Sequence, residues 1–499
     1  MASPHPPAPF PVQAKATPGP APEGMGTGLF ASSDIATGQD VLYIKVPFVA
    51  VLDTARLEDT CSGCFGKKQF ENDQIELKGC TGCQVVRYCD KACQAKDWKF
   101  AHSLECPIFR KLRPRILPNN ARAVLRMVLR YGRQKYDEQD LAIFFQLETH
   151  IQEIRERNED QWNRISLSAK AIKEYSGTAM QEELISAVGA KLDLNSFNLT
   201  NALYDRIGLY LHPYVALINH SCDYNSVFGF DGDELFVKAI RPIKKGDQIF
   251  ISYVDVTNPY KIRQKELSDR YFFTCQCSQC KRGIDTPQDA FLTSASKDSS
   301  ALEAAEEKAY RLMESVDVDV EPLQTVDQLM SAMHVLRQTS IWPISRQPYV
   351  SCRDELVTSL MFTGQFNKAF IQAAIRYIRV DPVVYRYDVH PIRHVHAWAL
   401  AKLAIHLSQG TELNPDDSDA VQKAELNLSF IVWSILHELV KREPESCTVP
   451  SFKQLVRTTF QEVHTVLISN GVDQKTLKTE ISKEWDKLER VIRAQLGKE

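Results

Sequence analysis

The chain contains 499 residues, 44% of which are hydrophobic, so it is long and apolar enough to fold into several globular domains rather than one core. The formal net charge of −3 at pH 7 argues against a globally basic surface and leaves nucleic acid as a weak candidate partner. The longest apolar run, residues 426–440, is interrupted by polar side chains and is too short to span a bilayer. We therefore expect a soluble protein of the cytoplasm and nucleus, with no membrane partner and with reduced cysteines.

The first 22 residues contain eight prolines, a composition that cannot pack a core and predicts a disordered arm over residues 1–22. No apolar segment of the signal-peptide type follows the start. In residues 23–60, the runs 41–44 and 48–52 are rich in β-branched and aromatic side chains. We expect these two runs to be short strands.

Residues 61–106 hold seven cysteines and one histidine in pairs with metal-ligand spacing. Two pairs are Cys-x2-Cys, and two are spaced i, i+4 and would share one helix face: Cys61 and Cys64, Cys80 and Cys83, Cys89 and Cys93, His102 and Cys106. Two tetrahedral Zn²⁺ sites require this number of ligands, whereas buried cysteines without metal would have to reach the spacing by chance.

The order of these pairs resembles the MYND zinc finger. The resemblance implies that the pairs interleave around two ions, the first held by Cys61, Cys64, Cys89 and Cys93, and the second by Cys80, Cys83, His102 and Cys106.

Residues 107–190 contain few turn-forming residues and predict a helical insert. Between Pro107 and Tyr136 there are nine Arg or Lys residues and no acidic ones. Four of these residues recur at helical spacing and form what we call the basic stripe: Arg122, Arg126, Arg130 and Arg133. We interpret the stripe as a solvated helix face, with a surface for nucleic acid or an acidic protein partner as the alternative.

Strands are predicted again within residues 191–258, where the runs 235–240 and 248–253 follow turns that contain glycine. Residues 284–300 are rich in Ser, Asp, Thr and Ala and indicate a linker. Residues 301–499 predict an all-helical domain.

A second group of thiols closes residues 259–283. It consists of Cys275, Cys277 and Cys280, one ligand fewer than tetrahedral zinc requires. Cys222 is the natural fourth ligand.

Five elements, spread over nearly the whole chain, resemble the SET domain of lysine methyltransferases, and specifically the SET-and-MYND (SMYD) family. They are residues 26–30, 195–197, 219–223, 246–253 and Phe273. The resemblance implies an α+β fold: a split SET-domain β-fold with an inserted MYND finger and helical insert, a post-SET zinc site that uses Cys222 with the later thiols, and an all-α TPR-like C-terminal domain. Two residues depart from the family pattern, Tyr224 in place of proline and Gln248 in place of an acidic residue.

The resemblance implies an S-adenosylmethionine-dependent protein-lysine N-methyltransferase that acts on histone or non-histone proteins and holds three Zn²⁺ ions. Methyl transfer needs a neutral amine aligned behind the methyl group, and an apolar channel favours that form by penalising the charged one. We predict that the Tyr253 hydroxyl is the catalytic group that orients the amine. The predicted cofactor-binding residues are Gly26, Thr27, Gly28, His150, Asn195, Asn219, His220, Tyr253 and Phe273.

Each of these residues has a structural explanation when it is taken alone. Gly26 and Gly28 could serve a turn, Tyr253 could face the core, and His150 could be a surface or packed helix residue. Their joint order favours the functional interpretation.

The alternative function is a catalytically silent scaffold or transcriptional co-regulator that binds Pro-rich or acidic partners through the finger and the helical domain; a test of cofactor binding separates it from an enzyme. A sequence-specific DNA-binding protein is disfavoured, because the finger lacks a long recognition helix between its ligand pairs. We expect a monomer.

Overall fold

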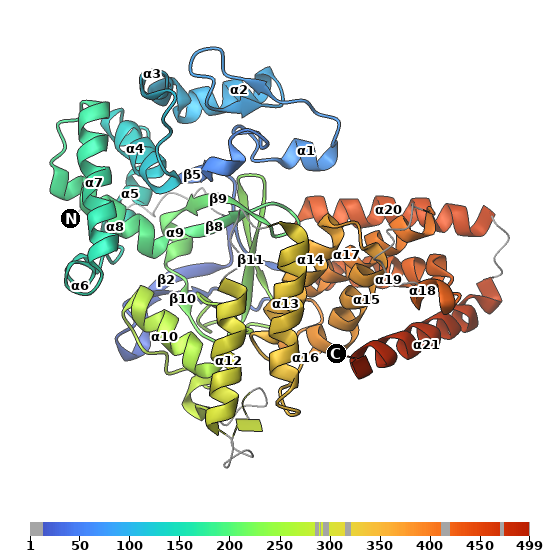
Figure 1. Cartoon of the computed structure of the whole chain (residues 1–499). Helices are drawn as coiled ribbons and strands as arrows, with labels where there is room; N and C mark the ends of the chain where they lie inside the picture. Colours follow the sequence, from blue (N-terminus) through green and yellow to red (C-terminus); the bar gives the residue numbers. More distant parts are fainter. Residues whose placement is uncertain are drawn as a thin grey trace. The chain divides into compact units, whose positions relative to one another are not determined.

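The computed structural model describes residues 13–284, 289, 291–292, 299–314, 321–410, 420–469 and 474–498 of the chain. They form two compact units. The first contains the described residues up to Ile251 together with Ser268–Thr274 and Val449–Phe452, and the second contains those of Ser252–Leu267, Cys275–Thr448 and Lys453–Glu499. Every strand of the described residues belongs to the first unit, which is α+β, and the second is helical (Figure 1).

The largest sheet of the first unit has four antiparallel strands in the order β1-β4-β12-β11. They are β1 (Gln13–Ala14), β4 (Asp40–Ile44), β12 (Glu234–Ala239) and β11 (Ser226–Asp231). β11 and β12 form a hairpin whose turn holds Gly232 at φ 68°, a conformation that favours glycine. β12 pairs with β4 although the zinc-ligand segment and the helical insert lie between them in the sequence. The sheet is therefore split, as the family resemblance implies.

The other sheets of the first unit are smaller. β5 (Val49–Leu52) pairs with β9 (Arg206–Leu211), which pairs with β8 (Phe197–Thr200). Three two-stranded sheets join β2 (Ala16–Pro20) with β3 (Thr27–Ala31), β6 (Lys78–Gly79) with β7 (Arg87–Tyr88), and, in parallel, β10 (Asn219–His220) with β13 (Phe250–Ile251).

The predicted strands 41–44, 48–52 and 235–240 are confirmed to within one residue at each end. The run 248–253 is shorter than predicted, since only Phe250–Ile251 forms a strand. The chain bends after Ile251, where the Ser252 hydroxyl donates to the carbonyl of Val254 at 2.7 Å.

The predicted disordered arm is wrong for residues 13–22, and residues 1–12 lie outside the described part of the chain. β1 pairs with β4, and β2 pairs with β3 along its whole length. Main-chain hydrogen bonds to neighbouring strands hold this segment, so it needs few apolar side chains. Its prolines are tolerated because β2 pairs on one side only.

The helical insert predicted over residues 107–190 is helical in the structure. The helices of the first unit are α1 (Lys67–Glu71), α2 (Lys91–Asp97), α3 (Ser103–Leu112), α4 (Asn119–Gly132), α5 (Glu138–Gln146), α6 (Ile151–Arg157), α7 (Glu159–Ser176), α8 (Glu182–Asn195) and α9 (Pro213–Ala216). Asp137 and Asn158 begin α5 and α7, and their side chains accept bonds from main-chain N–H groups of the first turn. α4 contacts β5, α7 and α8, so it joins the insert to a sheet.

The basic stripe lies on α4, and its prediction as a solvated face is wrong. Arg122, Arg126 and Arg130 are only 4%, 6% and 7% exposed, and Arg133 alone of the four is exposed. Main-chain carbonyls, carboxylates and aromatic rings of the first unit surround the three buried guanidinium groups. These arginines therefore contribute to the interior of the fold and do not form a partner surface.

The second unit is an array of helices, as predicted for residues 301–499. Its helices are α10 (Tyr260–Tyr271, whose last turn belongs to the first unit), α12 (Ser299–Glu314), α13 (Pro322–Arg337), α14 (Tyr349–Phe362), α15 (Phe366–Ile375), α16 (Asp381–Val384), α17 (Pro391–Ser408), α18 (Ala420–Lys423), α19 (Leu428–Lys441), α20 (Pro450–Ser469, whose first residues belong to the first unit) and α21 (Gln474–Lys498). α12 to α15 contact one another in succession. Among the described residues, no helix combines the length and the apolar character needed to cross a membrane.

The predicted linker, residues 284–300, lies mostly outside the described residues. Two of its described residues pack within the second unit. Asp289 is buried and pairs with Arg346 at 3.2 Å, and the Phe291 ring centre lies 5.3 Å from that of Trp342. This part of the segment is therefore anchored to the helical unit.

Candidate metal centres and cofactor site

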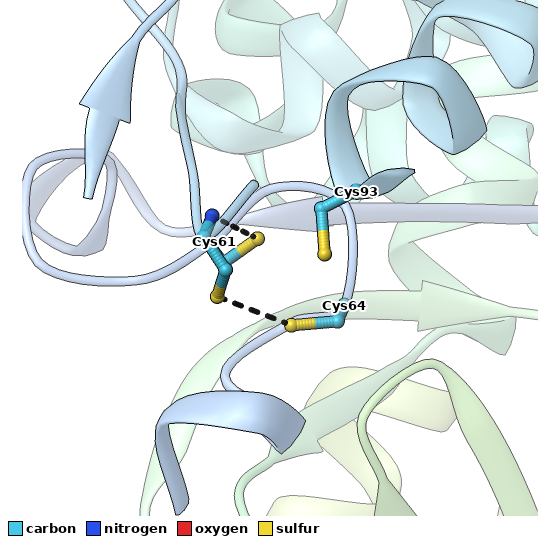
Figure 2. Close-up of side chains that lie close together, drawn as sticks. Cys61, Cys64 and Cys93 are labelled. Atoms are coloured by element: carbon cyan, nitrogen blue, oxygen red, sulfur yellow. Dashed lines mark hydrogen bonds between the residues drawn. The ribbon is translucent and has the colours of Figure 1, made fainter. Parts of the chain in front are cut away.

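The first group of metal ligands consists of Cys61, Cys64, Cys89 and Cys93, whose sulfurs all lie within 4.8 Å of one another. Figure 2 shows the sulfurs of Cys61, Cys64 and Cys93 turned toward a common point. The Sγ atoms of Cys64 and Cys89 are 3.8 Å apart. A tetrahedron with Zn–S bonds of about 2.3 Å has edges of about 3.8 Å, so the thiols fit a zinc ion.

Local structure brings these four thiols together. Asp90 begins α2 and accepts a bond from the Cys93 N–H at 2.8 Å, which fixes the first turn that carries Cys93. A Cβ on Gly63 would lie 2.3 Å from the Cys93 oxygen, so only glycine allows the two segments to approach. A hydrogen bond from Cys64 lowers the pKa of Cys61 to about 5, and the same contact raises the pKa of Cys64. The thiolate of one cysteine thus opposes ionisation of the neighbouring thiol. A bound dication would offset this repulsion between the thiolates.

The second group consists of Cys80, Cys83, His102 and Cys106, all buried. The Sγ atoms of Cys80 and Cys106 are 3.8 Å apart, and His102 Nε2 lies 3.6 Å from Cys83 Sγ. These distances again match the edges of a zinc tetrahedron, with a shorter Zn–N bond of about 2.0–2.1 Å. Residues 98–102 form a π-helical turn directly before α3, and this turn sets His102 on the same side as Cys106.

A buried carboxylate stands behind the His102 ligand. His102 Nδ1 is buried without a hydrogen bond and lies 3.7 Å from Glu105 Oε2. Burial is the largest single effect and raises the pKa of Glu105, but the charge and hydrogen bonds of Arg126 together with the contact to His102 outweigh it, and the pKa falls to about 2. An ionised carboxylate facing Nδ1 favours the tautomer that leaves Nε2 free to bind metal.

Arg126 connects this zinc group to the sheet. Its guanidinium donates to both Glu105 oxygens, at 2.6 and 2.8 Å, and to the Ala50 carbonyl of β5 at 2.8 Å. Asp97 lies 3.5 Å from the same guanidinium. The buried arginine therefore neutralises the carboxylates beside the finger and ties the finger to β5.

We expect Arg126→Met to lower the free energy of unfolding by about 3–5 kcal/mol, because it leaves the buried carboxylates of Glu105 and Asp97 without a counter-charge. Denaturant titration with saturating zinc measures this. Arg133→Met, an exposed change at the end of the same helix, is the matched control and should leave stability nearly unchanged. Equal stability of the two variants would contradict the role given to Arg126.

The third group of possible ligands consists of Cys222, Cys275, Cys277 and Cys280. Cys222 belongs to the first unit and the other three to the second. Within the first unit, His220 Nε2 lies 3.3 Å from Cys222 Sγ. Within the second, the Gln264 carboxamide donates to the Cys275 carbonyl and accepts from its N–H, both at 3.0 Å. These contacts hold the Cys222 side chain in the first unit and the Cys275 main chain in the second.

Asn219 and His220 lie on β10, where Asn219 pairs with Phe250 and His220 with Ile251 of β13. The Asn219 carboxamide donates to the carbonyls of Met25 and Thr27 at 3.4 and 3.3 Å, so the segment that contains Gly26 is bonded to β10. The structure therefore brings the predicted residues 26–28 and 219–220 into one place.

The two glycines of this segment serve different purposes. Gly26 has φ 67°, a conformation that favours glycine. A Cβ on Gly28 would lie 2.4 Å from Gln248 Nε2 and 3.0 Å from Asn219 Nδ2. The absence of a Cβ at Gly28 thus lets two carboxamide side chains pack against β3. It would also allow a ligand to approach the main chain.

Two consecutive phenylalanines connect the remaining predicted residues of the first unit. The Phe273 ring centre lies 5.9 Å from that of His220, and the Phe272 ring centre lies 5.0 Å from that of His150. Phe272 also packs on the buried cluster of Ile154, Ile165 and Ala190 in the helical insert. The sequence predicted Phe273 and missed Phe272, although the doublet directly before the thiols was a visible signal.

The comparisons with known proteins agree with this geometry. A family model described as the SET domain matches residues 26–254. A Schizosaccharomyces pombe protein named SET domain and MYND-type zinc finger protein 6 is 33% identical over 265 residues, which are 53% of this chain and 52% of that protein. Mouse histone-lysine N-methyltransferase SMYD3 is 26% identical over 393 residues, 76% of this chain and 86% of the mouse protein.

The chain contains a SET domain over residues 26–254 and is similar to SMYD proteins. It also resembles chicken N-lysine methyltransferase SMYD2, with 28% identity over 264 residues, 52% of this chain and 58% of that protein. The chain thus spans about half the length of the fission yeast and chicken relatives and most of the length of the mouse one.

Two further predicted residues, Tyr253 and Asn195, lie outside these contacts. Tyr253 is half-buried and lies in the bend two residues after β13, so its catalytic role stays a prediction. Asn195 ends α8, and its carboxamide donates to the carbonyls of Glu148 and Lys191 at 3.1 and 2.9 Å. In the structure its side chain therefore binds main chain near His150, which is a structural contact.

Proposed function

We propose that the chain is an S-adenosylmethionine-dependent protein-lysine N-methyltransferase of the SET type. The observation that carries the proposal is the junction of β10 with the glycine segment, where Asn219 bonds to Met25 and Thr27 and His220 packs against Phe273. Polar groups and an aromatic ring gathered at one place suit a ligand with an amino acid end and an adenine. The methyltransferase names of the SMYD2 and SMYD3 relatives support the same reaction.

Bound S-adenosylmethionine would supply an electrophilic methyl group on a sulfonium. In our proposal the segment 26–28, Asn219 and His220 hold this cofactor, with His150 and Asn195 at the edge of the same site. Phe273 provides an aromatic face, which favours a cationic ligand by about 0.5–2 kcal/mol. Tyr253 would align the amine of the substrate lysine and exclude water from it.

We further propose that Cys222 completes a third zinc site with the thiols of Cys275, Cys277 and Cys280. Since His220 lies 3.3 Å from Cys222, such a site would fix the imidazole that contacts the cofactor. Metal at this site would therefore support cofactor binding.

The proposed substrates are lysines of histone or non-histone proteins, met in the cytoplasm and nucleus by a monomeric enzyme. Pro-rich or acidic proteins are the proposed partners of the finger and the helical unit, and nucleic acid is a weaker candidate. The burial of three arginines of the basic stripe removes that helix face as an acidic-partner surface.

The test is calorimetric titration of the zinc-loaded chain with S-adenosylmethionine, run beside methyl transfer from labelled cofactor to histones and to fractionated lysate. We expect one bound cofactor per chain and labelled lysine. Absence of cofactor binding by the folded chain would contradict the enzyme and favour the scaffold function.

His220→Ala should weaken cofactor binding by about tenfold or more, which corresponds to about 1.4 kcal/mol. It removes an aromatic and polar contact of the proposed pocket but no proposed metal ligand. Zinc content measured on the same sample should stay that of the parent protein. His334→Ala, an exposed change on α13, is the control and should bind the cofactor normally. Normal affinity of His220→Ala would remove His220 from the site.

A further inference from the structure

Lys191, on α8, is a buried lysine bonded to main-chain carbonyls. Lys191 is only 8% exposed. Its Nζ donates to the carbonyl of Phe145 at 3.0 Å and to the carbonyl of Leu147. Burial lowers the pKa of Lys191. Most lysines keep the ammonium in water, so this placement calls for a structural reason.

The carbonyls that Lys191 binds belong to the C-terminal end of α5, which ends at Gln146. The last carbonyls of a helix lack intrahelical partners and carry partial negative charge, so an ammonium group suits them. Asn195 lies one turn after Lys191 and donates to the Glu148 carbonyl at 3.1 Å. Two side chains on one face of α8 thus donate hydrogen bonds to three main-chain carbonyls within residues 145–148.

His150 follows directly and has a strained main chain. Its φ of 44° is left-handed, a conformation that is unfavourable for a residue other than glycine and that persists only when neighbouring contacts impose it. The ring accepts or donates a bond with Glu153 at 3.0 Å and packs on Phe272 at 5.0 Å between ring centres. Phe272 is left-handed as well, with φ 61°.

We infer that Lys191 is a positioning residue of the proposed cofactor site. By holding the carbonyls of residues 145 and 147, it fixes the main chain that presents His150 to Phe272. Phe272 precedes Phe273, whose ring lies against His220. Lys191 therefore acts on the cofactor pocket through a continuous set of contacts and touches no reacting atom. The inference rests on the proposed function.

The test is Lys191→Met, which keeps an apolar stem of similar length and removes the charge and the donors. We expect the Kd and KM for S-adenosylmethionine to rise about tenfold, while kcat at saturating cofactor stays within about two-fold and KM for a peptide substrate is unchanged. Amide hydrogen exchange should accelerate in residues 147–152 and not in α4. Lys191→Arg, which restores charge and donors, should recover part of the affinity.

Lys170→Met is the matched control, since Lys170 is exposed on the neighbouring helix α7. It should change neither affinity nor exchange. Lys191→Gln serves as a milder variant if Lys191→Met fails to fold. Its Kd for S-adenosylmethionine should be higher than those of the parent protein and of Lys191→Arg, but should rise less than tenfold.

The outcomes separate this inference from the function on which it rests. If the parent protein binds no cofactor, the proposed function fails. If the parent binds and the folded Lys191 variants bind equally well, or if they lose kcat at unchanged Kd, the positioning role of Lys191 is overturned.

Discussion

Tyr253→Phe should lower turnover by about 10²–10³-fold, by analogy with the loss of one preorganised donor from a dry active site. The substitution keeps the aromatic wall and removes one hydroxyl. Because the proposed role is to align the amine in the transition state, the affinity for S-adenosylmethionine should stay within about two-fold of the parent value. The loss should therefore fall on kcat and not on cofactor binding.

Single-turnover kinetics with excess cofactor, combined with calorimetric Kd values, measure the two effects separately. Tyr131→Phe is the matched control, since Tyr131 is exposed on α4 and the same hydroxyl is removed. It should leave both quantities unchanged. Parent-like turnover of Tyr253→Phe would refute its catalytic role, and a large rise in Kd would make Tyr253 a binding residue instead.

Metal removal should have the second large effect. We expect three zinc ions per chain, in accordance with three groups of four ligands, and we expect a chelator to unfold the finger. Structural zinc sites bind the ion with apparent free energies of about 10–16 kcal/mol, and the folded state loses this stabilisation when the ion is removed. Cys83→Ser removes one ligand of the second group and should lower the zinc content to two ions per chain. The Tm of the first unit should fall as well.

Elemental analysis of metal-replete protein and thermal unfolding measure these changes. Cys352 and Cys447 are buried cysteines outside the three groups and provide controls of the same chemistry. Cys352→Ser and Cys447→Ser should retain three ions. A parent protein with one ion or none would contradict the zinc assignment, as would an undiminished zinc content in Cys83→Ser.

The zinc ligands of the finger could be predicted because their chemistry is local. Each pair is set by a short spacing, and the fold only has to bring pairs together. Cys64 and Cys89 meet at 3.8 Å as the interleaved order requires. Asn219 and His220 were singled out from their motif, and the structure places them on β10 beside β13, while their cofactor role stays a prediction.

The basic stripe could not be assigned from its helix alone. Periodicity placed Arg126 on one helix face, but burial of that face depends on Glu105 and on the carbonyl of Ala50, which are distant in sequence. The ordered segment 13–22 was missed for a related reason. Its stability comes from main-chain pairing with β3 and β4, a contribution that amino-acid composition does not reveal.

Asn195 shows a third kind of difference. Its place in the cofactor pocket stays a prediction, and the structure shows in addition that its carboxamide binds the carbonyls of Glu148 and Lys191. The identity of a residue in a motif did not reveal which of its atoms are already engaged. Phe272 is the reverse case, since only the contact with His150 shows its importance.

The pairing of β5 with β9 turns residues 53–207 into a closed loop, because the chain leaves the sheet at Leu52 and returns beside it at Gly208. Gly208 permits this closure, since a Cβ there would lie 2.1 Å from the oxygen of Val51. The entropy lost on closing a flexible loop grows only with the logarithm of its length, by about 0.6 kcal/mol for each doubling. The free energy of pairing β5 with β9 therefore depends only weakly on the number of residues between the two strands. An inserted module that folds around metal could have a very different size without changing the sheet.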